Sequence, residues 1–166
     1  ELMSMTGFRL ADHTRRLGVD LAVEAPDPVR LMDRACSLLA PSTPVVDVLL
    51  DQRVACGIGN VYKSEVLFLE GVHPLGPLGA ADPGVIAALY RRAHGLLRRN
   101  LQGGPRRTRF SLDGRGHLWV YRRRGLACLR CGTPVVRALL GGRPRSTYWC
   151  PRCQPEQGVG RGGGNP

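Results

Sequence analysis

Four cysteines near the end of the chain are the residues most clearly suited to chemistry. They form two Cys-x2-Cys pairs, Cys128 with Cys131 and Cys150 with Cys153, separated by eighteen residues. Each pair places two thiolates on one tight turn, and two such turns supply the four ligands of a structural, tetrahedral zinc ion. An iron–sulfur or rubredoxin-type iron site and two disulfides are the alternatives, the disulfides being disfavoured because the sequence shows no secretion signal.

The segment between the two cysteine pairs has the pattern of a β-hairpin. Residues 135–140 and 143–149 are strand-like and are joined by Gly141 and Gly142. A zinc ion would fix this hairpin, and arginines at its tip, Arg143 and Arg145, could then reach a phosphate or a groove. The two remaining cysteines, Cys36 and Cys56, lie singly in apolar surroundings and are predicted to be small core residues.

A second candidate site is the turn Gly57-Ile58-Gly59-Asn60, which we expect to join two helices. A helix that begins there presents unpaired N–H groups and the positive end of its dipole, which together attract phosphate. Gly59 would allow close approach, Asn60 would cap the helix or bind the anion, and Lys63 would add charge. The alternative is an ordinary helix–helix turn with Asn60 as N-cap.

Charge is distributed unevenly along the 166 residues. The formal net charge is +11, from 24 Lys+Arg and 13 Asp+Glu. Residues 1–90 hold seven basic and eleven acidic side chains, whereas residues 91–166 hold 17 basic and two acidic ones. This asymmetry predicts a nucleic-acid partner for the second half, with a solvated basic face as the alternative. No run of 18 apolar residues is present, and no long basic amphipathic helix indicates a membrane partner.

The elements that must position these residues are mainly α. Apolar spacing predicts a helix from Pro28 capped by Asp27, a short helix from Thr43, a helix after Asn60 and a helix opened by Asp82 and Pro83. Residues 118–121 resemble a short strand. We divide the chain into a remnant and linker at 1–27, a helical domain at 28–101, an arginine- and glycine-rich loop at 102–117, a zinc finger at 118–155 and a flexible tail at 156–166.

These motifs together resemble the formamidopyrimidine-DNA glycosylase/endonuclease VIII family. LLDQR at residues 49–53, GIGNVYKSE at 57–65 and HP at 73–74 are similar to its helix–two-turn–helix domain. WVY at 119–121, CLRCGTP at 128–134 and RSTYWCPRCQ at 145–154 are similar to its zinc finger. The resemblance covers roughly residues 15–155, and the pattern is similar to the endonuclease VIII-like branch.

The resemblance implies base-excision repair of DNA by a bifunctional glycosylase and abasic-site lyase. In the family, the residues matching Asn60 and Arg145 hold the phosphates that flank a nucleotide flipped out of the duplex. We expect Gly59, Lys63 and Thr147 to belong to the same DNA-binding set, and one structural zinc ion to be the cofactor. Double-stranded DNA, preferably damaged or abasic, is the expected partner of a monomeric, bacterial, cytoplasmic and nucleoid-associated protein.

The chain departs from the family at its beginning. Family enzymes start with Pro-Glu, whose proline amine attacks the sugar, and continue into a β-sandwich domain. This chain starts Glu1-Leu2-Met3, so we expect it to be the C-terminal part of such an enzyme, without a catalytic residue and with little or no activity alone. The other hypotheses are a non-enzymatic zinc-containing RNA- or DNA-binding protein and a metal-dependent redox module, which would contain coloured iron.

Overall fold

A computed structural model describes residues 17–156. Four α-helices, a short 3-10 turn and two small two-stranded sheets make up its regular structure. In the described part of the chain no helix is long and apolar enough to cross a membrane. In chain order the elements are β1 (Val19–Asp20), α2 (Pro28–Leu38), α3 (Val45–Leu50), β2 (Ala55–Cys56), α4 (Asn60–Leu69), η1 (Leu78–Ala80), α5 (Pro83–Arg99), β3 (Val136–Leu140) and β4 (Arg145–Trp149).

Two of the helices begin where the sequence predicts. The Asp27 carboxylate accepts hydrogen bonds from the first turn of α2, and the Asp82 carboxylate accepts one from the first turn of α5. In each helix a proline follows the cap, because its fixed φ suits the first helical position and no N–H is lost there. The short helix α3 begins at Val45 rather than at Thr43, with Pro44 as its N-cap.

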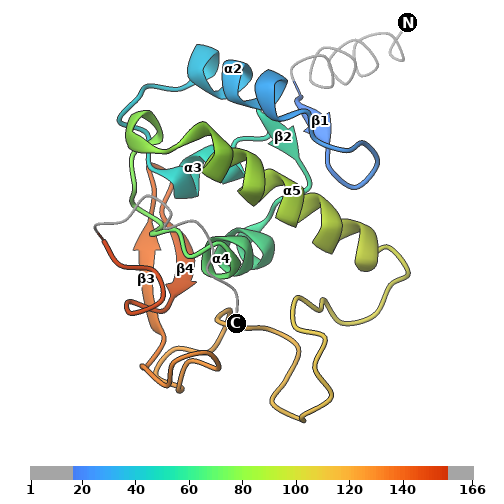
Figure 1. The fold of residues 1–166 in the computed structure, drawn as a ribbon, viewed down its shortest axis with the longest axis vertical. Helices are drawn as coiled ribbons and strands as arrows, with labels where there is room; N and C mark the ends of the chain where they lie inside the picture. Colours follow the sequence, from blue (N-terminus) through green and yellow to red (C-terminus); the bar gives the residue numbers. More distant parts are fainter. Residues whose placement is uncertain (1–16, 157–166) are drawn as a thin grey trace, which may run out of the picture.

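The helical core lies around α5, the longest helix. Figure 1 shows α5 crossing the domain, with α2 on one side and α4 on the other. Tyr90 of α5 is fully buried, and its hydroxyl donates to the carbonyl of Val48 in α3 at 3.1 Å. Leu21 is also fully buried in this core, next to β1, which pairs in parallel with β2. Residues 17–21 are therefore packed onto the helical domain, although we assigned them to a remnant and linker.

The second half of the described chain contains no helix after Arg99. Its regular structure is the antiparallel hairpin of β3 and β4, in which Ala138 pairs with Thr147. The fold class predicted from the sequence, mainly α, therefore fits the helical domain. The part that follows Arg99 is a loop-rich module built around a β-hairpin. The expectation of a strand at residues 118–121 is wrong, because these residues form turns and bends.

A buried carboxylate on α4 explains the conformation of residues 118–121. Glu65 accepts hydrogen bonds from the backbone N–H groups of Trp119, Val120 and Tyr121 at 2.8–2.9 Å, and from the hydroxyl of Thr108. Three N–H groups directed at one carboxylate cannot also join a strand ladder. No local pattern indicates that a carboxylate 54 residues away replaces that ladder.

Further contacts near the C-terminal end of the finger join it to α4 and to the segment that follows α4. The Ser64 hydroxyl accepts from the Tyr148 N–H at 3.3 Å, and the Gln154 side chain donates to the Val72 carbonyl at 2.8 Å. Phe68 of α4 belongs to the apolar cluster of the finger, together with buried Val120 and Val135. The hairpin consequently lies beside α4, against which β4 packs (Figure 1).

Candidate nucleic-acid interface and metal centre

The four cysteines that the sequence pairs meet in one cluster. Their sulfur atoms all lie within 4.8 Å of one another, with Cys131 Sγ and Cys150 Sγ 3.4 Å apart and Cys128 Sγ and Cys153 Sγ 3.9 Å apart. Zinc–sulfur bonds of about 2.3 Å in a tetrahedron place neighbouring sulfurs about 3.8 Å apart. The cluster fits one zinc ion with four thiolate ligands, which leaves no open position for catalysis.

The other two cysteines do not behave alike. Cys56 is half-buried, and its thiol lies 3.3 Å from the Gln52 carbonyl. Cys36 is exposed on α2, so the prediction that it is a core residue is wrong. Helical spacing indicates only which side chains share a face, and on α2 the buried side chains are Leu31 and Ala35.

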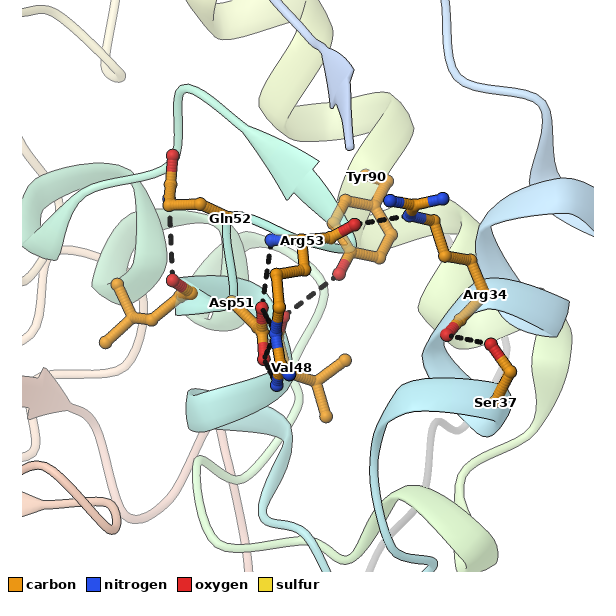
Figure 2. A network of polar contacts seen from close by, with 8 residues as sticks. Arg34, Ser37, Val48, Asp51, Gln52, Arg53 and Tyr90 are labelled. Carbon is orange, nitrogen blue, oxygen red and sulfur yellow. Dashed lines mark hydrogen bonds and ion pairs between the residues drawn. The ribbon is translucent and has the colours of Figure 1, made fainter. Parts of the chain in front are cut away.

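Polar contacts hold the two turns between α3 and α4 (Figure 2). Asp51, which directly follows α3, accepts from the Arg53 backbone N–H and forms an ion pair with the Arg53 guanidinium. The Arg53 carbonyl in turn accepts from Arg34 of α2. The Gln52 side chain donates to the Ile58 carbonyl at 3.3 Å, which ties the first turn to the second. Of the LLDQR segment, the Gln52 side chain thus holds the chain at Ile58, two residues before α4 begins.

The two glycines of the second turn have different roles. Gly57 has φ = 102°, a conformation that other residues rarely adopt, so the turn itself requires glycine there. Gly59 has φ = −110°, which any residue adopts, and a Cβ placed on it would meet nothing within 4 Å. Nothing inside the described chain therefore requires glycine at position 59. A glycine at position 59 would be required only by a ligand that approaches the exposed backbone closely, because a side chain there would block it.

Asn60 is the first residue of α4 rather than its N-cap. Gly59 occupies the cap position, and among residues 17–156 no side chain is found capping this end of the helix. The alternative in which Asn60 serves as an N-cap is therefore wrong. The Asn60 side chain is half-buried, and its Oδ1 accepts from Lys63 Nζ at 3.4 Å. The N–H groups of the first turn remain available to an anion.

The hairpin brings Arg145 beside this helix end. Arg143 and Arg145 are exposed at the hairpin tip, and the Lys63 ammonium donates to the carbonyl of the adjacent Ser146 at 3.2 Å. Asn60 and Arg145, 85 positions apart in the sequence, therefore flank a single buried lysine. The structure thus places the backbone next to Arg145 and the Asn60 side chain on the same lysine, and the resemblance assigns both residues to phosphates.

Lys63 and Thr147 lie behind this surface rather than on it. Both are fully buried, and the Lys63 ammonium donates to Thr147 Oγ1 at 2.9 Å. Burial lowers the pKa of Lys63 to about 8. We therefore revise the expectation that these two side chains touch DNA directly, because neither reaches the surface in this structure.

Asp47 of α3 is a positioning residue that the sequence did not reveal. Its Oδ2 accepts from the Gly142 N–H at 2.9 Å and so holds the hairpin tip to the helical domain. Gly141 has φ = 95°, and a Cβ on it would collide with the Asp47 carboxylate. In the sequence, the Gly141-Gly142 pair indicates a turn, but nothing in it indicates that the turn packs against the Asp47 carboxylate.

Part of the arginine-rich loop is also buried. Arg109 is 7% exposed and forms an ion pair with Asp113, and its guanidinium carbon lies 5.3 Å from the centre of the Trp119 ring. Arg130 stacks over the Phe68 ring at 4.6 Å. Some of the positive charge in the second half of the chain therefore supports the finger, and the exposed arginines form the basic surface.

A two-turn connection between α3 and α4, followed by a four-cysteine hairpin docked on α4, defines a helix–two-turn–helix module with a zinc finger. Two family models match the chain in this order. The formamidopyrimidine-DNA glycosylase H2TH domain matches residues 21–111, and the zinc finger found in FPG and IleRS matches residues 125–155. The chain belongs to the formamidopyrimidine-DNA glycosylase/endonuclease VIII family, and corresponds to the part that carries these two domains.

Individual relatives agree with this assignment. The chain is 42% identical over 139 residues to Endonuclease 8 2 of Mycobacterium bovis, covering 83% of this chain and 52% of the relative. It is 42% identical over 115 residues to the DNA-(apurinic or apyrimidinic site) lyase Nei2 of Mycolicibacterium smegmatis, covering 69% and 44%. The chain thus spans about half the length of the curated relatives it matches.

A solved structure has the same fold. The Lactococcus lactis Fpg in complex with abasic-site DNA superposes with a TM-score of 0.71 at 25% identity, covering 90% of this chain and 55% of that one. That protein is thus a neighbour in fold whose structure was solved with abasic-site DNA.

Proposed function

We propose that this chain is the damaged-DNA-binding portion of a base-excision-repair glycosylase and abasic-site lyase. Asn60, the backbone at Gly59 and Arg145 hold the phosphates that flank a flipped nucleotide. The observation that supports the proposal is that Lys63 contacts both Asn60, at the start of α4, and the backbone of Ser146, next to the exposed Arg145 of the hairpin. Holding the phosphates offsets the unstacking of the flipped base, which costs a few kcal/mol.

The complete protein would remove oxidised bases and cleave the strand at the resulting abasic site. Within this chain, the sole lysine of the sequence is an unsuitable nucleophile, because its amine is buried and donates to three acceptors. We propose that the chain binds an abasic duplex without forming a covalent bond to it. The chain would act as a monomer and, in the cell, at the bacterial nucleoid, where its DNA ligand is found.

Fluorescence anisotropy with a duplex containing one abasic site tests the binding. The purified zinc-loaded chain should bind this duplex more tightly than an intact duplex or single-stranded RNA, and its affinity should fall steeply with salt. Arg145→Ala should weaken binding about tenfold or more, by the loss of one charged phosphate contact. Arg30→Ala is a matched control, because Arg30 is exposed on α2, a helix that lies across α5 from α4 (Figure 1).

The glycine at position 59 gives a second test. Gly59→Ala should leave the thermal unfolding midpoint unchanged or slightly raised, because its φ is ordinary and the space around it is empty. The same substitution should weaken abasic-DNA binding. Equal affinity of Gly59→Ala and wild type would contradict close approach of a phosphate to this turn, and equal affinity for single-stranded RNA would favour a general nucleic-acid-binding protein.

Borohydride trapping on the abasic duplex tests the chemistry separately. We expect a shifted band on a native gel and no covalent adduct. An adduct would show that this chain holds a reactive amine, and repeating the reaction with Lys63→Met would identify whether Lys63 supplies it.

A further inference from the structure

The ε-ammonium of Lys63 uses all of its donors inside the protein. Its Nζ lies 2.9 Å from Thr147 Oγ1, 3.2 Å from the Ser146 carbonyl oxygen and 3.4 Å from Asn60 Oδ1. A lysine ammonium carries three N–H donors, and the three acceptors match that number. With the side chain fully buried, no donor remains for a DNA phosphate.

The three acceptors come from two elements that are distant in the sequence. Asn60 is the first residue of α4, whereas Ser146 and Thr147 belong to β4. The Thr147 hydroxyl, which accepts from Lys63, donates in turn to the carbonyl of Arg145 at 3.1 Å. One buried cation therefore joins the side chain of Asn60 to the backbone that carries Arg145.

This contact fixes the orientation of the Asn60 amide. A protonated lysine has no lone pair, so only the carbonyl oxygen of an amide can face it. The NH2 group of Asn60 must then point away from Lys63, with both of its N–H donors available beyond the start of α4. An unconstrained amide could rotate and present its oxygen to a phosphate, which would repel the anion.

The charges around Lys63 come from both flanking elements. Asp47 on α3 favours its charged form and Arg145 on β4 opposes it, while burial lowers its pKa. Asp47 itself holds the hairpin tip through the Gly142 N–H. The cation therefore lies inside the joint between helix and hairpin, directly behind the surface assigned to the phosphates.

We propose that Lys63 is a positioning residue, which fixes the Asn60 amide with its NH2 group outward and couples it to the Arg145 segment of the hairpin. The inference rests on the proposed function, since it explains how the two phosphate-binding groups are held in register. It also distinguishes Lys63 from a direct phosphate contact.

The salt dependence of binding separates these two roles. The affinities of wild type, Lys63→Met, Asn60→Ala and the double variant for the abasic duplex are measured by anisotropy over a series of salt concentrations. Lys63→Met should lose about tenfold in affinity, as Asn60→Ala does, and the double variant should lose no more than either single one. The slope of log affinity against log salt should stay at the wild-type value, because a lysine that touches no phosphate releases no counterion.

Three results would overturn the inference: unchanged affinity of Lys63→Met, additive losses in the double variant, or a slope shallower by about 0.9, which indicates a lost phosphate contact. If the wild-type chain itself shows no preference for abasic DNA, the proposed function fails instead.

Asn60→Asp keeps the inference testable even where Lys63→Met folds poorly. Aspartate retains the acceptor for Lys63, so this variant should unfold at or above the wild-type temperature, but it has no N–H to offer a phosphate and should bind abasic DNA more weakly than Asn60→Ala. Wild-type affinity of Asn60→Asp would show that the outward NH2 group does not hold an anion.

Discussion

The carboxylate of Glu65 should be the largest single polar contribution to docking of the finger. One of its oxygens accepts from the Val120 and Tyr121 N–H groups at 2.9 and 2.8 Å, and the other accepts from the Trp119 N–H at 2.8 Å and from the Thr108 hydroxyl. Glu65 is fully buried, so water cannot replace a bond that is lost. Glu65→Gln keeps the shape of the side chain and removes one acceptor.

The loss of stability in Glu65→Gln depends on which of the two carboxylate oxygens is replaced by the NH2 group. The less costly orientation places NH2 toward Thr108, whose hydroxyl can turn to accept, so that only the Trp119 N–H loses its acceptor. A buried unsatisfied donor costs about 1–3 kcal/mol, and each of the two remaining bonds weakens by about 1 kcal/mol without the charge. The substitution also removes the cost of burying a charge, which offsets part of this loss. The free energy of unfolding should therefore fall by about 3 kcal/mol in total.

Urea unfolding of the zinc-loaded chain measures this loss. Domains of this size have total stabilities of about 5–15 kcal/mol, so a loss of about 3 kcal/mol moves the midpoint clearly. Thr108→Val is the control, because it removes one hydroxyl bond and should cost about 1 kcal/mol. A Glu65→Gln midpoint equal to that of Thr108→Val or higher would refute the assignment of Glu65 as the main polar anchor.

Backbone strain, the buried lysine and the metal give three further expectations. Arg122 has φ = 60°, so Arg122→Gly should raise stability by about 0.5–1 kcal/mol in thermal unfolding, whereas Arg124→Gly should lower it. Because the folded pKa of Lys63 is about 8 and its ordinary value is 10.5, the unfolded chain binds more protons between these values. Unfolding titrations should therefore show stability rising by about 3 kcal/mol across pH 8–10.5 relative to Lys63→Met, while DNA affinity falls. Chelation of zinc should abolish DNA binding and leave most of the helical circular dichroism, because the core around α5 contains no finger residue; complete loss of the helical signal would contradict two separate cores.

Local patterns in the sequence were sufficient for the metal site and for the starts of α2 and α5. Two Cys-x2-Cys pairs need only short-range geometry to form their turns, and the ligand set predicts zinc before any fold is known. Asp27 with Pro28 and Asp82 with Pro83 marked the starts of α2 and α5, because capping involves only neighbouring residues. The hairpin between the cysteine pairs was predicted from its two glycines and flanking strand-like segments.

Only the tertiary structure decided what the polar residues of GIGNVYKSE contact. Asn60, Lys63, Ser64 and Glu65 lie within six positions, and nothing in their order indicates that one flanks the candidate phosphate site while three bind the finger. The sequence predicts Lys63 as a member of the DNA-binding set, because a lysine side chain is normally exposed. Its burial depends on acceptors more than eighty residues away, and such long-range pairing is set by how the hairpin packs on α4, which no local pattern encodes.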